Sequence, residues 1–333
     1  MRPDSPQEFH QHEMWLMAVF GILVVIMLLL YLGVFNRKAH KISNREALIW
    51  SMVWIGLALL FSIPVYLYLG AESGSDFLSA YLIEKALSVD NIFVFILIFS
   101  YFKVPDQYQH KVLYYGIVGA IVFRAIFIFA GLGMIRITYF PPFEAWGHTI
   151  HLNGVLTLFG FFLVYAGVKT FRHKSAGSRD FSNNWMIRLS RRLCPFSIEY
   201  DNGNFFTFRN GKRLATPLLM VVLVLEGTDI IFAVDSIPAI FAITNDPFIL
   251  YSSNIFAILG LRALYFLLAN FMPMFRFLHY GLAVILIFIG IKMLMVDFYK
   301  LPSPISLSIV ASILILSVLA SVLIKDNKDT KNV

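Results

Sequence analysis

Long apolar runs, separated by short polar segments, fill almost the whole chain. A helix needs about 20 apolar residues to cross the hydrocarbon core of a bilayer, and windows of that length predict nine membrane-spanning helices. The predicted spans cover 14–35, 47–69, 77–102, 112–135, 151–171, 216–243, 252–272, 278–297 and 304–324. The pattern therefore predicts an all-α polytopic membrane protein.

Composition agrees with a location in lipid. Of the 333 residues, 59% are hydrophobic and 14% are charged, a balance that the surface of a soluble domain would not tolerate. The segment before the first span lacks a basic region, and the span is longer than the apolar core of a signal peptide, so we expect it to remain as an anchor. Cys194 is the single cysteine. An internal disulfide is therefore excluded, and redox chemistry is not indicated.

Lysines and arginines are concentrated in alternate loops of this topology. With the N-terminus outside, the outer loops hold Arg2, Arg136 and Lys300. The cytoplasmic loops and tail hold Arg37, Lys38, Lys41, Arg45, Lys103, Lys111, a basic cluster in 172–213, Arg276, Lys325, Lys328 and Lys331. The positive-inside rule thus predicts an outer N-terminus and a cytoplasmic C-terminus. Because the basic residues are divided among loops, the net charge of +7 does not indicate nucleic-acid binding.

Two of the predicted spans carry the same acidic signature. Residues 84–91 read E-K-A-L-S-V-D-N, and residues 229–236 read D-I-I-F-A-V-D-S. Each has a carboxylate, an aspartate six residues later, and then a short oxygen-bearing side chain. Ionisable groups at membrane depth cost a few kcal/mol each, so they indicate an ion or proton pathway.

Further landmarks recur in the same order. F-R-A-I-F at 123–127 is echoed by L-R-A-L-Y at 261–265, and Y-A-G-V-K at 165–169 by F-I-G-I-K at 288–292. Each copy contains three spans, and since three is odd, the second copy crosses the membrane in the opposite sense. The sequence therefore predicts two inverted three-helix repeats, a plan typical of transporters that bind substrate at the repeat interface.

The chain then divides into five parts. We predict an N-terminal two-helix segment (1–76), the first repeat (77–171), a basic cytoplasmic insert (172–215), the second repeat (216–297) and a C-terminal helix with a cytoplasmic tail (298–333). Within the insert, 183–193 is amphipathic and suits a membrane surface. The segment that follows predicts a hairpin with an Asn210-Gly211 turn. The insert is interpreted as a structural cap, with regulation as the alternative.

The polar side chains of the two signatures form an oxygen-only ligand set. Such sets suit hard divalent cations such as Mn²⁺, Mg²⁺ or Ca²⁺, whereas neither signature contains the histidine or cysteine that zinc favours. The candidate metal ligands are Glu84, Asp90, Asn91, Glu226, Asp229, Asp235 and Ser236, with Ser88 and Thr228 beside them. His148 and His151 have the spacing of a metal pair, but we interpret them as interfacial histidines. No permanently bound cofactor is expected.

Buried bases offer a structural alternative. Lys85, Arg124 and Arg262 lie in the predicted spans and could balance the acids or act as gates, while Lys169 and Lys292 lie near span ends and can snorkel. We expect the two arginines to pair with Asp90 and Asp235. Burying so many ions only for stability would be costly, which favours a functional role.

On a continuous helix, residues six apart lie on different faces. Glu84 and Asp90 must therefore face different partners, unless the helix is unwound between them. Gly227, Thr228 and Pro238 favour a break in the sixth span, because glycine tolerates irregular dihedrals and proline removes a helical hydrogen bond. The third span has no glycine or proline at the signature. We therefore expect any break to be clearer in the sixth span.

At this point the residues carry a resemblance to a known family. The stretches E-K-A-L-S-V-D-N-I-F, L-E-G-T-D-I-I-F-A-V-D-S-I-P-A-I-F-A, L-G-L-R-A-L-Y-F-L-L-A and G-L-A-V-I-L-I-F-I-G-I-K-M resemble the TerC family of integral membrane proteins, most closely its Alx-type members. The resemblance covers 81–299 and implies a relationship to the lysine exporters. It implies a bacterial inner-membrane protein linked to manganese export, alkaline pH and, in some relatives, tellurite resistance.

The family's intramembrane acids correspond to Glu84, Asp90, Glu226, Asp229 and Asp235. Gly227 departs from the Alx-type pattern, which tends to have another residue after the glutamate, and this departure could change affinity or ion choice. The function predicted is a secondary transporter that exports Mn²⁺, with protons as the exchanged partner. No G-x-x-x-x-G-K-[ST] is present for ATP binding, and no hydrolase motif indicates an enzyme.

Two alternatives remain open. One is a non-transporting membrane organiser that assists the assembly or metalation of exported proteins through the 172–215 insert. The other is export of Ca²⁺ or an organic cation. The oligomeric state is not readable from the sequence.

Overall fold

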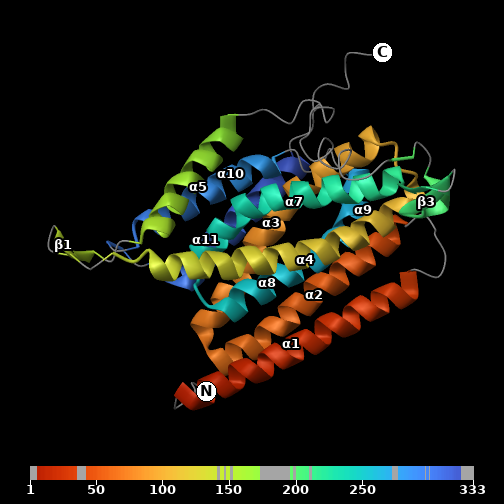
Figure 1. Cartoon of the computed structure of the whole chain (residues 1–333). Helices are drawn as coiled ribbons and strands as arrows, with labels where there is room; N and C mark the ends of the chain where they lie inside the picture. The colour runs from red at the N-terminus through yellow and green to blue at the C-terminus, as the bar shows by residue number, and fades with distance from the viewer. Residues whose placement is uncertain are drawn as a thin grey trace.

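A computed structural model of the chain describes residues 6–35, 43–140, 143–145, 148–150, 153–172, 196–197, 200–209, 212–271, 277–296, 298–299 and 301–323. In this part the protein is a bundle of long helices with two short hairpins (Figure 1). The helices are α1 (Pro6–Phe35), α2 (Asn44–Leu69), α3 (Ala71–Tyr101), α4 (Asp106–Ile137), α5 (Gly154–Arg172), α7 (Pro217–Phe241), α8 (Pro247–Leu259), α9 (Leu261–Phe271), α10 (Leu278–Leu294) and α11 (Ser303–Leu323).

Each predicted span contains a helix, and the range 252–272 contains two. Six segments of the described chain are long and apolar enough to cross a membrane: Asn44–Leu69, Asp106–Ile137, Gly154–Arg172, Pro217–Phe241, Pro247–Ala269 and Ser303–Leu323. Met14–Met27 and Leu278–Leu294 are shorter apolar helices. The protein is therefore a multi-pass helical membrane protein, and the count of nine spans stays a prediction.

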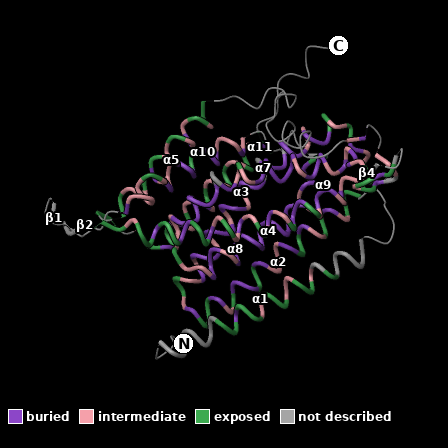
Figure 2. Tube along the Cα trace, in the orientation of Figure 1, coloured by how far each residue is buried: buried purple, intermediate pink, exposed green. Residues whose placement is uncertain are grey.

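The centre of the bundle is formed by α3, α7, α8 and part of α4, where buried residues predominate (Figure 2). The most apolar window of Pro247–Ala269 is 78% buried, against 17% for the windows of Gly154–Arg172 and Ser303–Leu323. Large apolar side chains such as Leu158, Phe161 and Leu316 are exposed on these outer helices. Extensive exposed apolar surface marks contact with lipid. The acidic signatures thus lie on the central helices α3 and α7.

The predicted break in the sixth span is wrong. Helix α7 is continuous through Gly227 and Thr228, and Pro238 falls in its last turn, where loss of one helical hydrogen bond is tolerated. The break lies instead at Gly260, between α8 and α9. A Cβ at this position would collide with Nζ of Lys85 and lie 3.2 Å from Cβ of Trp54. A side chain at this position would therefore have to displace the Lys85 ammonium from the break.

Helices α5 and α10 approach so closely that glycines meet backbone across the contact. A Cβ on Gly167 would lie 2.7 Å from the Ala283 oxygen and 3.0 Å from the Ile287 nitrogen. A Cβ on Gly290 would lie 2.8 Å from the Gly160 oxygen and 2.9 Å from the Val164 nitrogen. Three α10 residues lie 123 residues after α5 counterparts: Ala283 after Gly160, Ile287 after Val164 and Gly290 after Gly167. Each glycine therefore contacts the counterparts of the residues that surround the other glycine. Such reciprocity is what a two-fold arrangement produces.

The predicted hairpin before the sixth span is confirmed. Strand β3 (Phe206–Arg209) pairs antiparallel with β4 (Lys212–Ala215). The predicted turn residues Asn210 and Gly211 lie outside the described residues, as do Cys194 and the amphipathic stretch 183–193.

A second hairpin, β1 (Phe143–Ala145) with β2 (His148–Ile150), lies between α4 and α5 and was not predicted. Side chains of His148 and His151 are outside the description.

The segment leading to β3 is fixed to the ends of α3 and α4. The Tyr200 hydroxyl donates to the Phe102 carbonyl at 2.6 Å, and Nζ of Lys111 donates to the Gly203 carbonyl at 2.9 Å. Burial raises the pKa of Tyr200 to about 12. These contacts agree with a segment packed as a cap on the bundle.

Candidate functional site

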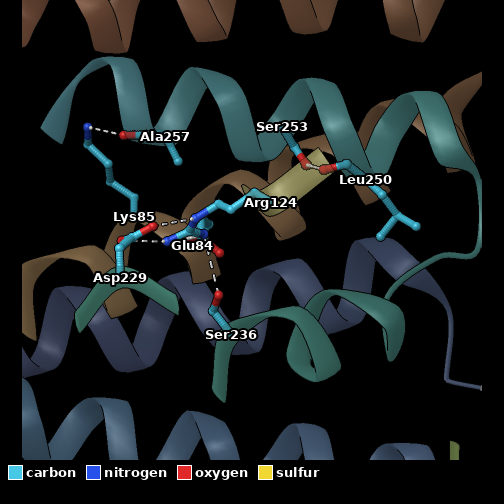
Figure 3. A network of polar contacts seen from close by, with 8 residues as sticks. All are labelled: Glu84, Lys85, Arg124, Asp229, Ser236, Leu250, Ser253 and Ala257. Carbon is cyan, nitrogen blue, oxygen red and sulfur yellow. Dashed lines mark hydrogen bonds and ion pairs between the residues drawn. The ribbon is translucent and has the colours of Figure 1, made fainter. Parts of the chain in front are cut away.

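Arg124 is the centre of a buried ionic network. It lies in α4 and is 0% exposed. Its Nη1 donates to Glu84 Oε1 of α3, while Nε and Nη2 donate to the two carboxylate oxygens of Asp229 on α7, each at 3.4 Å. Nη1 also lies 3.4 Å from the Ser236 hydroxyl. Figure 3 shows the guanidinium between the two carboxylates. Arg124 therefore links α4 to both α3 and α7.

Helical periodicity explains how α7 presents two of these partners. Asp229 and Ser236 are seven residues apart, which places them two turns apart on nearly the same face. Both are buried, as is Glu84. Arg124 thus contacts Glu84 and Asp229. The side chains of Asp90 and Asp235, with which we expected the two arginines to pair, lie outside the described residues, so those pairings stay predictions.

The network carries more negative than positive charge. Two carboxylates meet one guanidinium, and Glu84 Oε2 has no hydrogen-bond partner within the described chain. A surplus charge removed from water is strongly unfavourable unless another charge or a proton compensates it. The site is therefore suited to receive a cation or a proton.

Glu226 adds a third carboxylate on the neighbouring face of α7. It is 9% exposed, and its Oε2 has no hydrogen-bond partner in the described part of the protein. The carboxylate rests against Gly119 of α4, where any Cβ would collide with it. A side chain at Gly119 would therefore have to displace the Glu226 carboxylate from its present position.

A small cavity lies beside Asp229. Its volume is about 10 Å³, roughly room for one water-sized group. Asp229 and Arg262 are its charged lining residues, and the other walls are Phe95, Leu113, Gly116, Ile117, Ala120, Leu225, Ile258 and Leu261. The carboxylate that holds Arg124 therefore also faces an internal space.

The other predicted ligands have different surroundings. Asn91 is buried, and Ser88 is fully buried with a hydroxyl that has no partner in the described chain. Thr228 donates to the Val224 carbonyl of its own helix at 2.7 Å. The side chains of Asp90 and Asp235 lie outside the described residues. Among the side chains that are described, no three from His, Cys, Asp and Glu form a metal cluster.

Lys85 contacts the helix break. Its Nζ donates to the Ala257 carbonyl at 3.3 Å, in the last turn of α8, instead of joining the carboxylates next to it in Figure 3. A cation near the C-terminus of a helix interacts favourably with the unpaired carbonyls there. Glu84, the preceding residue in α3, contacts Arg124, so two adjacent residues of α3 join the ionic network and the break.

Asn254 and Gly260 are two residues of interest that the sequence reasoning missed. Asn254 in α8 is 0% exposed, and neither atom of its amide has a hydrogen-bond partner among the described residues. The repeat contained a signal for it: Asn254 follows Gly116 by 138 residues, the spacing between Arg124 and Arg262. A comparison of the repeats by their charged landmarks alone does not reveal this position, because its counterpart is a glycine.

Fold and site together define a multi-pass integral membrane protein with a buried ionic network at its centre. The chain belongs to the TerC family of integral membrane proteins, whose family model matches residues 69–329. The resemblance inferred from the acidic motifs is thereby confirmed.

The relatives match along almost their whole length. The chain is 46% identical over 308 residues to an uncharacterized membrane protein, STKORF319, of Myxococcus xanthus, covering 92% of each chain. It is 46% identical over 321 residues to Alx of Salmonella typhi, covering 94% of this chain and 95% of the relative. It is 44% identical over 308 residues to Alx of Escherichia coli K12, covering 90% and 91%. The Alx proteins are described as membrane-bound redox modulators. No solved structure matches the chain.

Proposed function

We propose that this protein is a secondary transporter that exports Mn²⁺ from the cytoplasm across the bacterial inner membrane in exchange for protons. The observation that carries the proposal is the buried network in which Glu84 and Asp229 share Arg124. Carboxylate and hydroxyl oxygens are the ligands that hard divalent cations prefer. The surplus negative charge of the network supplies the attraction for such an ion.

Arg124 acts in this proposal as an internal counterion. When Mn²⁺ reaches Asp229 from the adjoining cavity, the two positive charges of the metal replace the guanidinium between the carboxylates. Opening to the outside lets protons compete for the same oxygens, and the metal leaves. Arg124 then returns to the carboxylates as they lose their protons, and the cycle can repeat. The buried arginine thus prevents the empty site from carrying uncompensated charge in lipid.

We propose nine spans arranged with two inverted three-helix repeats, with the N-terminus outside and the C-terminus in the cytoplasm. The reciprocal contacts of Gly167 and Gly290 across α5 and α10 support this arrangement, because a two-fold axis between the helices would generate them. The acids Glu84 and Asp229 begin equivalent signatures, so the proposed site lies at the repeat interface, as in other inverted-repeat transporters.

The carboxylates, and not a thiol, carry the proposed function. The Alx relatives are described as redox modulators, but this chain has a single cysteine and cannot form an internal disulfide. The organiser alternative assigns the activity to the 172–215 insert. Shortening that insert would then abolish function, while neutralising the buried acids would leave it intact.

The test is Mn²⁺ efflux from loaded cells that express the wild type, Glu84→Gln or Asp235→Asn at equal levels in the membrane. The proposal expects each substitution to reduce efflux, since each removes one anionic oxygen donor. Ser51→Ala is the control, because the Ser51 hydroxyl bonds the Ala47 carbonyl of its own helix. Unchanged efflux in both acid variants would contradict the proposal. Competition by Ca²⁺ or an organic cation in the same assay identifies the alternative substrates.

A further inference from the structure

Asn254 has a buried carboxamide for which the described fold provides no partner. Both amide atoms of this α8 residue are buried and lack hydrogen bonds within the described chain. An unpaired buried polar group costs about 1–3 kcal/mol. A residue that is retained at such a cost in the centre of a protein requires an explanation outside the resting hydrogen-bond network.

Helical spacing places Asn254 at the end of the cavity that contains Asp229. Ile258 lines this cavity, and Asn254 is four residues earlier on the same face of α8. On α4, Ala120 lines the cavity and Arg124 is four residues later on the same face. Figure 1 shows α4 running toward the β1 end of the molecule and α8 running back from that end. Asn254 and Arg124 therefore both lie one turn beyond the cavity wall, in the same direction.

The internal repeat leads to the same place. The spacing that relates Arg124 to Arg262 also relates two cavity-lining residues, Ala120 and Ile258, and relates Gly116 to Asn254. On one side of the network, Gly116 lines the cavity beside Asp229. The repeat symmetry proposed above would place Asn254, the counterpart of Gly116, beside Glu84, the counterpart of Asp229.

We propose that the side-chain oxygen of Asn254 is an additional ligand for the hard divalent cation, on the Glu84 side of the site. An asparagine carbonyl oxygen is a common ligand for such ions. The assignment rests on the proposed transport function and deepens it. With Arg124 between the carboxylates, the amide has no partner; with a cation there, it gains one. Asn254 thereby favours the loaded state over the empty one.

The test uses the intact protein in detergent and in proteoliposomes, with Mn²⁺ alone as the probe. Asn254→Leu removes the oxygen while keeping a similar volume, and Asn254→Asp retains an oxygen. Ser253→Ala is the matched control, because the Ser253 hydroxyl is already satisfied by the Ile249 carbonyl at 2.6 Å. The measurements are Mn²⁺ affinity by calorimetry, transport KM, and the melting temperature without metal.

We expect Asn254→Leu to weaken Mn²⁺ binding and to raise the transport KM by at least about tenfold. Losses of this size occur even when the substituted residue only hydrogen-bonds to a metal ligand. Asn254→Asp should retain binding, and Ser253→Ala should match the wild type. Without metal, Asn254→Leu should melt at the same or a higher temperature, because an unpaired polar group has been removed. A purely structural asparagine would lower the melting temperature instead.

Two results would overturn the inference in distinguishable ways. If the wild type binds and transports Mn²⁺ and Asn254→Leu does so equally well, Asn254 is not a ligand, while the proposed function stands. If the wild type neither binds nor transports Mn²⁺, the proposed function fails, and the assignment of Asn254 fails with it.

Discussion

Lys85 of α3 donates a hydrogen bond to the carbonyl of Ala257, 172 residues later in the chain, at the point where α8 ends. The preceding residue, Glu84, holds Arg124. Two adjacent residues of α3 therefore contact the ionic network and the break between α8 and α9. This break interrupts the predicted span 252–272. We therefore expect that a movement of α8 relative to α9 shifts Glu84 through the Lys85 contact.

Substituting Gly260→Ala tests this link. The added methyl would displace Nζ of Lys85 and approach Trp54, so we expect slower Mn²⁺ transport and a modest loss of stability. Gly56→Ala in α2 is the control, since nothing lies within 4 Å of its Cβ position. Transport rates in proteoliposomes and melting temperatures check both variants. Equal transport by Gly260→Ala and wild type would show that the Lys85 contact at the break is dispensable.

Removing the central cation should destabilise the empty protein. Arg124→Gln leaves Glu84 and Asp229 buried without their shared counterion, and breaking a buried ion pair in this way costs about 3–5 kcal/mol. We expect a large fall in melting temperature that added Mn²⁺ partly reverses, because a ligand stabilises the state that binds it. Scanning fluorimetry of detergent-solubilised protein measures both effects.

A second variant serves as the control for that experiment. Adding Glu84→Gln to Arg124→Gln reduces the uncompensated charge, so the double variant should melt above Arg124→Gln. Melting of the double variant below the single one would contradict the electrostatic explanation.

Two glycines on α4 form a matched pair that tests the space occupied by Glu226 at Gly119. Gly119→Ala forces a methyl group into the Glu226 carboxylate, whereas Gly133→Ala enters open space. Overpacking of this kind typically costs about 1–3 kcal/mol, while glycine to alanine at an open helical position gains roughly 0.5–1 kcal/mol. Thermal melting should move in opposite directions for the two variants. A stabilised Gly119→Ala would show that Glu226 does not need this space.

Tyr200 predicts a stability change at alkaline pH. Burial raises its pKa to about 12 from an ordinary value of about 10, so the folded state keeps the phenolic proton that the unfolded state loses. The contribution of Tyr200 is therefore present below pH about 10 and is lost as the pH rises toward 12. Tyr200→Phe also removes the bond to the Phe102 carbonyl, which is worth about 0.5–1.5 kcal/mol.

Melting curves measured from pH 8 to 11 check this expectation. The wild type should lose stability relative to Tyr200→Phe between pH about 10 and 11. Parallel curves for the two proteins over this range would mean that Tyr200 does not titrate differently in the folded state.

The sequence predicted the architecture more fully than the interactions within it. Apolar length placed a helix in every predicted span, and the charged residues inside those runs directed attention to Glu84, Arg124 and Asp229. The pairing of Arg124 could not be obtained from the sequence, because it depends on the depths at which α3, α4 and α7 are packed. Arg124 and Asp229 are 105 residues apart in the chain, and no local pattern relates them.

The helix break shows the same limit. Gly227 and Pro238 are the strongest local signals for a break, yet α7 remains helical through Gly227, and Pro238 lies in its last turn. Gly260 is an unremarkable glycine in the sequence. Its role depends on Lys85 reaching it from α3, a contact between distant residues that only the packed structure reveals.

The central claim is that the carboxylates around Arg124 carry Mn²⁺ in exchange for protons. The most direct measurement is Mn²⁺ uptake into inside-out vesicles with an imposed pH gradient, for the wild type and for Asp229→Asn. The account predicts uptake that follows the gradient in the wild type and is abolished in Asp229→Asn. Gradient-dependent uptake that persists in Asp229→Asn, or none in correctly inserted wild type, would contradict it.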